Sequence, residues 1–337
     1  MVIPLRRKVG RREGGLVLEA EFVLDDAARG QLLSRFGEGV REWCAGLPRL
    51  VEHYCSRWDL RLEQAQSGST SRVYFGWQRG GPARPGQPER EVALKVTPEP
   101  SIAREEATAL RAWTATPHAV SLLDADPDGG ALLLERIRPG TKLWDAGVMP
   151  PVQEMAELLT GLRVATGDLT GQLPPLSERI EFIFELIRGR LAGPRVAPLV
   201  DPDLVTAGHE LAHTLVRTGP TALVHGDLHL ANILIARQPG QPRQTRETCR
   251  LVAIDPRPGL GDPDFDAVDW VLAPGATQTP EQQVRQRIAE LGGLVPGLDG
   301  DRLWAWCQAS AIIIVVQHLH NRPADSRIPF LLQLAAR

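Results

Sequence analysis

The segment LVHGDLHLANILI, residues 223–235, decides how the rest of the chain is interpreted. In it an apolar run is followed by the polar turn His225-Gly226-Asp227. Five residues after the aspartate comes Asn232, which leads into a second apolar run. A further apolar run, 251–254, ends at Asp255. Strands that deliver polar side chains at their ends are typical of a catalytic centre, so the pattern predicts that two carboxylates and one amide converge.

These three side chains match the demands of phosphoryl transfer from ATP. That reaction needs a carboxylate to orient or deprotonate the attacking hydroxyl, and oxygen ligands for the Mg²⁺ that bridges the phosphates. We predict that Asp227 is the catalytic carboxylate and that Asn232 and Asp255 are the metal ligands. Because the Asp-x4-Asn spacing lets the aspartate face the acceptor while the amide oxygen turns to the metal, one loop can supply both functions.

A lysine earlier in the chain completes the predicted nucleotide site. Lys95 lies on the predicted strand 91–96, and Glu105 and Glu106 lie in the early turns of the following predicted helix. In this arrangement the ammonium group contacts the α- and β-phosphates, and a carboxylate holds the ammonium group in place. We assign that carboxylate to Glu106, with Glu105 as the alternative that the spacing leaves open.

Two further segments are predicted to contact the nucleotide. A turn between two predicted strands has a single glycine, and the amides and hydroxyls of the residues that follow it are expected to cap the phosphates. Those residues are Ser69, Thr70 and Ser71. The segment from Glu135 to Ile137 is expected to form the hinge between two lobes, where backbone groups would bond adenine. No G-x-x-x-x-G-K-[ST] run occurs, which excludes a P-loop nucleotide site.

The remaining pattern predicts an α+β fold of two lobes, a small β-rich one and a larger, mainly helical one. One or two helices within 25–57, interrupted near Pro48, come first. The expected strands are 60–66, 72–77, 91–96, 119–124 and 131–135, and the later helices are 101–113, 152–166, 177–191 and 202–217. Polar loops are expected at 80–88 and 237–250. The predicted domains are helices that pack on the lobes (1–57), a nucleotide-binding N-lobe (58–138) and a catalytic, substrate-binding C-lobe (139–337).

The composition of the chain excludes several classes of protein. Among 337 residues, 38 are basic and 41 acidic, a net charge of −3 that lacks the bulk basicity of nucleic-acid or membrane-surface binders. The four cysteines have neither zinc-site nor disulfide spacing. No apolar run is long enough to span a membrane. We therefore expect a cytoplasmic protein with no obligate protein partner, whose basic N-terminal segment is a solvated end.

The motifs together resemble those of aminoglycoside phosphotransferases and related small-molecule kinases of the protein-kinase-like fold. The matching blocks are Glu106-x-x-Ala109-Leu110-Arg111-x-Trp113, the run 132–140, H-G-D-L-H-x-x-N, Ile254-Asp255-Pro256 and Gly261-Asp262-Pro263-x-x-Asp266. They span about residues 68–270, and a late helix with Trp304 and Trp306 is similar too. Within these kinases the chain looks most like the group with streptomycin 6-phosphotransferases and hydroxyurea-inactivating kinases, which implies ATP and Mg²⁺ as cofactors.

Departures from the protein-kinase pattern indicate a small acceptor molecule. Gly226 stands where the catalytic loop of protein kinases has an arginine, and Pro256 follows the metal aspartate in place of Phe-Gly. Only six residues separate Asp255 from Asp262, too few for a long activation segment, and an A-P-E signature is absent. An antibiotic hydroxyl therefore fits better than a protein serine.

Several polar residues near these motifs have structural interpretations as well. His225 is expected to support the loop, and Asp262 and Asp266 are expected to bond backbone amides. Five aspartates against the single Arg257 nevertheless predict an acidic wall that attracts a cationic substrate, which favours an aminoglycoside. These aspartates are residues 255, 262, 264, 266 and 269.

Other functions stay open at this point. The acceptor can instead be hydroxyurea, a peptide antibiotic or another metabolite, because motifs do not identify the acceptor pocket. A catalytically inactive kinase-like binding protein is a further alternative, against which the joint presence of Lys95, Asp227, Asn232 and Asp255 argues. The hydroxyl that is modified, the preference for ATP or GTP and the oligomeric state are not specified by the motifs.

Overall fold

The computed structural model describes residues 24–68, 70–80, 88–147, 149–165, 167–237, 249–274, 279–321 and 325–337. Contacts divide the chain into two compact units. Unit 1 comprises residues 1–107 and 121–136, and unit 2 comprises residues 108–120 and 137–337. The basic N-terminal segment, Ser69 and most of the predicted loops 80–88 and 237–250 lie outside the described residues.

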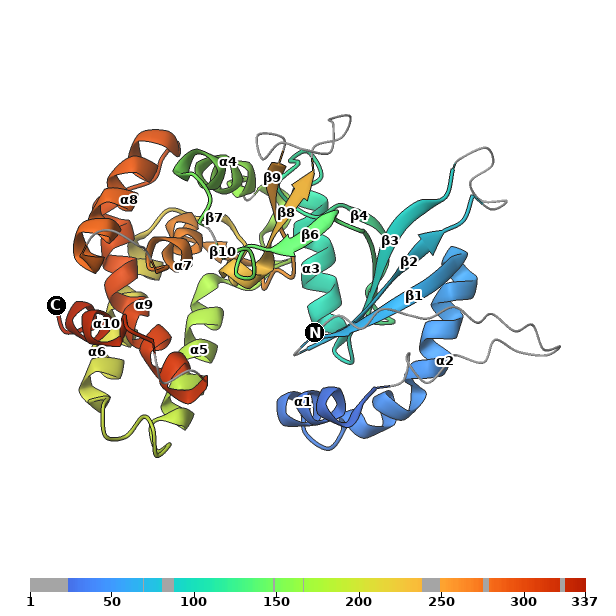
Figure 1. The fold of residues 1–337 in the computed structure, drawn as a ribbon, viewed down its shortest axis with the longest axis horizontal. Coiled ribbons are helices and arrows are strands. Elements are labelled where there is room, and N and C mark those ends of the chain that lie inside the picture. The colour runs from blue at the N-terminus through green and yellow to red at the C-terminus, as the bar shows by residue number, and fades with distance from the viewer. Residues whose placement is uncertain are drawn as a thin grey trace. The chain divides into compact units, whose positions relative to one another are not determined.

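Unit 1 is built on a five-stranded antiparallel sheet in the order β1-β2-β3-β5-β4 (Figure 1). Its strands are β1 (Leu60–Ser67), β2 (Arg72–Gln78), β3 (Arg90–Val96), β4 (Leu122–Asp126) and β5 (Ala131–Glu135). On β3, Val92 and Leu94 belong to the apolar core of this unit. Since successive side chains of a strand alternate between faces, Lys95 lies on the opposite face of the sheet.

Helices α1 (Asp26–Phe36) and α2 (Val40–Trp58) cover one face of this sheet, and Figure 1 shows α2 beside β1. The chain breaks between them at Gly37, whose φ of 73° ends α1, whereas Pro48 lies inside α2. The predicted interruption near Pro48 is therefore wrong. Proline removes one helical hydrogen bond, but α2 buries an apolar face against the sheet on both sides of it, and that burial keeps the helix continuous.

Unit 2 is mainly helical and also contains two small sheets. Its principal helices are α4 (Val152–Leu162), α5 (Leu176–Arg190), α6 (Pro202–Thr218), α7 (Val268–Val271), α8 (Pro280–Leu294), α9 (Gly300–Asn321) and α10 (Ile328–Ala335). The sheets are β6-β8-β9 and β10-β7, made by β6 (Pro139–Lys142), β7 (Ala222–Val224), β8 (Ile233–Arg237), β9 (Cys249–Ala253) and β10 (Gly259–Gly261). Helix α9 is the apolar centre, in contact with α5, α6, α8 and α10. The predicted α+β fold is confirmed.

The segment expected to form a strand at 119–124 is divided between the two units. Strand β4 begins only at Leu122, while Val120 donates its amide to the carbonyl of Ala253 and Ala253 donates to that of His118. Residues 118–120 thus extend the β8-β9 sheet of unit 2. Helix α3 (Pro100–Ala112), close to its predicted 101–113, begins in unit 1 and ends in unit 2. No helix in the described part of the chain could cross a lipid bilayer.

Candidate active site

The loop after β7 carries the predicted catalytic carboxylate, and its backbone accepts only glycine at the second position. Gly226 has a φ of 73°, in the left-handed region that L side chains rarely adopt. A Cβ at this position would lie 2.1 Å from the carbonyl oxygen of Arg257. The arginine that protein kinases carry here is therefore excluded by steric contact as well as by sequence.

His225, the first residue of this loop, is a buried support, as its sequence context predicts. Its Nε2 donates to the carbonyl of Ile254 at 3.1 Å, and its Nδ1 accepts the amide N–H of Asp227 at 3.3 Å. Burial lowers the pKa of His225 to about 4, so the ring is neutral at pH 7. The ring also stacks on Trp113 at 6.1 Å. His225 therefore fixes the start of the loop and carries no charge.

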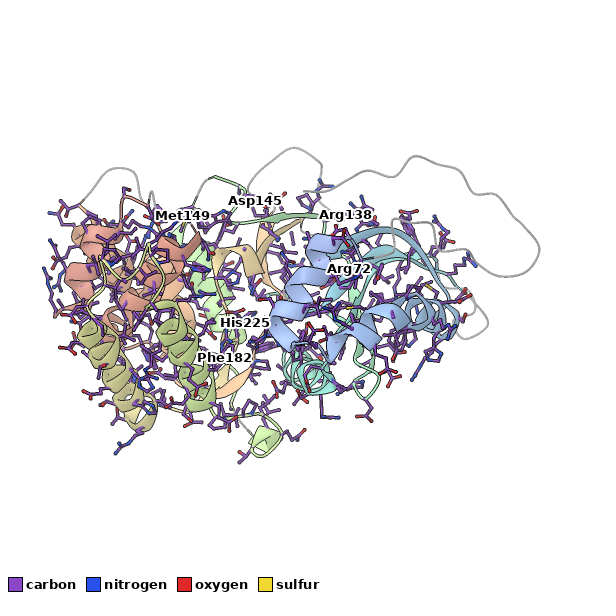
Figure 2. All side chains as sticks on the ribbon, turned by 90° about the horizontal axis from the view of Figure 1, so that it is seen from below. Arg72, Arg138, Asp145, Met149, Phe182 and His225 are labelled. Carbon is purple, nitrogen blue, oxygen red and sulfur yellow. The ribbon has the colours of Figure 1, made fainter. Side chains whose placement is uncertain are left out.

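Asp227 is held by an arginine that the motifs did not reveal. Nη2 of Arg179, on α5, donates to Oδ1 of Asp227 at 2.8 Å, and its Nε donates to the carbonyl of Gly226 at 3.1 Å. The guanidinium also lies 5.6 Å from the ring centre of Phe182, which Figure 2 labels together with His225. The Asp227 side chain keeps 30 % of its surface exposed. Its Oδ2 also accepts Nδ2 of Asn232 at 3.4 Å. The carboxylate is thus oriented by two partners and still partly exposed, which suits a group that meets a substrate hydroxyl.

No local sequence signal could have found Arg179. It lies in a predicted amphipathic helix 48 residues before Asp227, outside every motif that resembles a kinase. Only the packing of α5 against the loop brings the two residues together.

Asn232 and Asp255 are brought together by the pairing of β8 with β9. Ile233 pairs with Ala253, and Ile254 donates its amide to the carbonyl of Asn232 at 2.9 Å, which places Asp255 next to the end of the loop. Nδ2 of Asn232 donates to the carbonyl of Asp227 at 3.0 Å. Because the amide nitrogen is directed at the loop, the amide oxygen is the atom that can face a cation.

The backbone of Asp255 is unusual for a residue with a side chain. Its φ of 58° lies in the left-handed region, which costs about 1–2 kcal/mol for an L-residue and is tolerated where the surroundings determine it. The carboxylate of Asp255 and the amide oxygen of Asn232 are hard oxygen ligands of the kind that Mg²⁺ prefers. The donor set at this end of β9 therefore fits the metal that the sequence predicts.

In unit 1 the expected lysine–glutamate ion pair is present, and Glu106 forms it. Nζ of Lys95 donates to Oε2 of Glu106 at 2.5 Å, and both side chains are buried, at 6 % and 1 % exposure. Glu105, the alternative partner, is only partly buried. The cost of removing two charges from water offsets most of their attraction, so such a pair is weak evidence for stability. It is informative mainly because buried charged pairs cluster at functional sites.

Thr70 and Ser71, which are also predicted to contact a nucleotide, lie beside the sheet of unit 1. Thr70 and Ser71 are buried in the turn before β2, where the amide of Gly68 donates to the carbonyl of Ser71 at 2.9 Å. Ser69 lies outside the described residues. This tight turn confirms the predicted hairpin, whereas its contact with phosphates stays a prediction.

The predicted hinge begins where β5 ends. The carboxylate of Glu135 accepts the amide and the hydroxyl of Ser121, at 2.9 and 2.8 Å. Its own amide donates to the carbonyl of Ser121 at 3.0 Å. The side chain of Glu135 is thus used internally, which leaves backbone carbonyls and Ile137 for the adenine contacts that the sequence predicts.

The predicted acidic wall is wrong for three of its five aspartates, because they are buried and bound within unit 2. Asp262 pairs with Arg302 and accepts Nε1 of Trp306 at 2.6 Å. Asp264 accepts Nη2 of Arg163 at 2.5 Å. Asp266 accepts the amides of residues 225 and 226, at 2.7 and 2.9 Å, and burial raises its pKa to about 6. The expectation that 262 and 266 bond backbone amides is confirmed, since Asp262 also accepts the amide of residue 264.

Known proteins resemble the chain along most of its length. A family model for aminoglycoside/hydroxyurea antibiotic resistance kinases matches residues 85–320, more than half of the chain. The chain belongs to this family. It is a phosphotransferase, and the resemblance inferred from its motifs is confirmed.

Two curated relatives match this kinase over most of its length. It is 31 % identical to a hydroxyurea phosphotransferase from Kitasatospora aureofaciens over 309 residues, 88 % of this chain and 78 % of that protein. It is 30 % identical to a streptomycin 6-kinase from Streptomyces glaucescens over 292 residues, 80 % of this chain and 82 % of that protein. Among solved structures, an ethanolamine kinase from Plasmodium vivax matches with a TM-score of 0.54 at 14 % identity over 95 % of both chains, which shows the shared fold.

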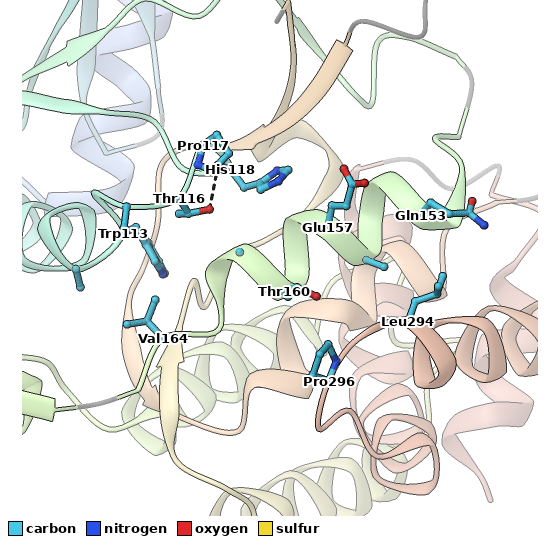
Figure 3. Close-up of a pocket in the computed structure, with 14 residues that line it drawn as sticks. Trp113, Thr116, Pro117, His118, Gln153, Glu157, Thr160, Val164, Leu294 and Pro296 are labelled. Carbon is cyan, nitrogen blue, oxygen red and sulfur yellow. Dashed lines mark hydrogen bonds between the residues drawn. The ribbon is translucent and has the colours of Figure 1, made fainter.

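Unit 2 of this kinase also has a hollow of about 660 Å³ (Figure 3). Its lining comes from the end of α3, from α4 and from the end of α8, and includes Trp113, His118, Glu157 and Pro296. None of Asp227, Asn232 and Asp255 lines it. This hollow is therefore not the place where the phosphoryl acceptor is expected.

Proposed function

We propose that this kinase transfers the γ-phosphoryl group of ATP to a hydroxyl group of streptomycin or a related aminoglycoside. One observation carries the proposal. In a chain of this kinase family, Arg179 orients the partly exposed Asp227, whose loop also carries Asn232. The similarity to a streptomycin 6-kinase over 80 % of the chain supports streptomycin as the acceptor. The reaction takes place in the cytoplasm and requires no nucleic acid, membrane or partner protein.

The residues of unit 2 perform the acceptor chemistry. Asp227 accepts a hydrogen bond from the acceptor hydroxyl and takes up its proton as the oxygen attacks the γ-phosphorus and the bond from that phosphorus to ADP breaks. Arg179 keeps the carboxylate in that orientation, and the neutral His225 holds the loop without adding a positive charge beside it. Positioning of this kind removes much of the entropic cost of bringing acceptor and phosphate together.

Nucleotide and metal would be held by the groups that the sequence assigned to them. Asn232 and Asp255 would hold Mg²⁺, which offsets negative charge on the phosphates as the phosphoryl group moves. Lys95, fixed by Glu106, would contact the α- and β-phosphates. Ser69, Thr70 and Ser71 would cap the phosphates, and backbone groups of Glu135 and Ile137 would bond adenine.

Hydroxyurea is a second candidate acceptor, favoured by the relative that covers 88 % of the chain. The burial of Asp262, Asp264 and Asp266 also weakens the charge argument that favoured a cationic antibiotic over a neutral one. Streptomycin and hydroxyurea must therefore be compared directly.

A substrate panel tests the proposal. The purified kinase is incubated with Mg²⁺ and ATP or GTP, together with streptomycin, other aminoglycosides or hydroxyurea, and the D227N variant serves as the control. We expect ATP consumption with streptomycin, and a product whose mass has increased by one phosphate, only with the wild type. Turnover of hydroxyurea alone would favour the second candidate. Absence of turnover with every acceptor would favour a binding protein without catalysis.

A further inference from the structure

Helices α5 and α6 of unit 2 present two imidazole rings to one carboxylate. Glu181 lies on α5, and His209 and His213 lie on α6. Nε2 of His209 lies 3.1 Å from Oε2 of Glu181, and Nε2 of His213 bonds the other oxygen. One potential ligand atom from each residue lies within 4.8 Å of the others. No motif of the kinase family includes these three residues, and the proposed reaction does not use them.

The arrangement is preformed by its surroundings. His209 and His213 are four residues apart, so they share one face of α6. The ring of His209 packs between that of Phe184, at 4.7 Å, and that of His213, at 4.6 Å. His209 is 16 % exposed, whereas Glu181 and His213 keep 43 % and 35 % of their surfaces in solvent. The group is therefore held on the protein side and open on the solvent side.

We propose that Glu181, His209 and His213 form a site for a divalent transition metal such as Zn²⁺, which clamps α5 to α6. Two neutral imidazoles and one carboxylate are a frequent ligand set for zinc and leave one position of a tetrahedron for water. This chemistry differs from the all-oxygen set expected at Asn232 and Asp255, because Mg²⁺ disfavours nitrogen ligands. The two sites therefore select different ions.

In the metal-free protein, Arg188 holds His209 in a form that opposes metal binding. Its Nη2 donates to Nδ1 of His209 at 2.7 Å, which places the proton of the neutral ring on Nε2, directed at Glu181. A neutral imidazole that binds a metal through Nε2 gives up its Nε2 proton to solvent and carries a proton on Nδ1 instead. Nδ1 then no longer accepts a hydrogen bond, so the exposed Arg188 must swing away. A nearby guanidinium also repels a cation. The proposal thus predicts that removing Arg188 strengthens metal binding, which a simple Glu–His hydrogen-bond network does not predict.

The metal would act through the position of α5 and not through the reacting atoms. Arg179 lies two residues before Glu181 on the same helix, and residues two apart point to widely different sides of a helix. The proposed metal therefore binds the side of α5 that faces away from Asp227. Its first expected effect is on the stability of unit 2.

The test measures Zn²⁺ affinity and thermal stability in the full-length protein, with the wild type, H213A, E181Q and R188A compared. We expect the wild type to bind one equivalent of Zn²⁺ with an affinity at least about tenfold higher than that of H213A or E181Q. Saturating Zn²⁺ should raise Tm by several degrees in the wild type and less in these two variants. R188A should bind more tightly than the wild type.

Free cysteines are the main competing ligands, so the comparison with H213A is made on the same chain, which retains all four. Replacement of Zn²⁺ by Co²⁺ distinguishes the sites, because thiolate ligands give an intense charge-transfer absorption and imidazole and carboxylate ligands do not. Equal affinity in the wild type and H213A, a thiolate spectrum, or weaker binding in R188A would each overturn the proposal. Since the kinase activity is measured separately with Mg²⁺, failure here leaves the proposed function intact.

Discussion

Two aspartate-bearing segments of unit 2 lie close in the chain and have opposite environments. Asp227 is 30 % exposed; its Oδ1 accepts Arg179 at 2.8 Å and its Oδ2 accepts Nδ2 of Asn232 at 3.4 Å. In the segment 262–266, three aspartates are buried and each bonds partners within the fold. The sequence shows acidic residues in both segments. The difference teaches that a carboxylate becomes available for chemistry when the fold leaves part of it exposed, whereas a fully enclosed carboxylate serves as an internal acceptor.

The largest expected effect is the loss of turnover when Asp227 is removed. D227A should lower kcat by about 10²- to 10⁴-fold, because proton transfer to a positioned base contributes that much. ATP binding and the free energy of unfolding should change little, since the residue is partly exposed. Steady-state kinetics, nucleotide titration and urea unfolding of the same preparation check this. Near wild-type kcat in D227A would remove Asp227 from the catalytic role.

D262A should show the opposite behaviour, with stability lost. This change leaves Arg302 and Nε1 of Trp306 without their buried partner, which should cost about 3–5 kcal/mol of unfolding free energy. Urea unfolding of D262A and wild type measures the difference. The fraction that remains folded should keep its kcat. A stable D262A protein with reduced kcat would instead place Asp262 in the reaction and break the contrast between the two segments.

The neutral state of His225 predicts a pH dependence of stability. Its pKa falls from 6.5 to about 4 on folding, so the unfolded chain binds more protons between these values. Stability from this residue is present above pH 6.5 and is lost as the pH falls to about 4, by up to about 3 kcal/mol. H225Q, which cannot titrate, keeps a donor for the carbonyl of Ile254. The unfolding free energy of the wild type relative to H225Q should therefore fall on acidification, and a difference that is constant with pH would contradict a neutral buried ring.

The smallest expected effect concerns Arg179, the arginine that orients Asp227. R179A should lower kcat by about 10- to 100-fold with little change in KM for ATP, because a misplaced base loses that much. R179K should restore only part of this, since lysine cannot bond Asp227 and the carbonyl of Gly226 together. In a D227N background, R179A should have no further effect on kcat. An equal loss in both backgrounds would show that Arg179 acts independently of Asp227.

The sequence predicted the α+β fold, the strand that carries Lys95, a partner at Glu106 or Glu105, and the supporting role of His225; the structure selects Glu106. Each of these depends on local spacing or on strand alternation, and both patterns can be seen in a single sequence. It failed on the helix break at Pro48 and on the acidic wall. In both cases a neighbouring element overrides the local signal, the sheet of unit 1 for Pro48 and the cations Arg163 and Arg302 for the aspartates.

Sequence alone therefore determined the order of the chemical groups along the chain and the family of reactions that they serve. Tertiary structure decided which acids stay accessible, which arginine orients Asp227, and which histidines meet Glu181 on the surface of α5 and α6. The physical reason is that residue type and spacing set what a side chain can do, while its charge state and availability depend on burial and on partners far away in sequence.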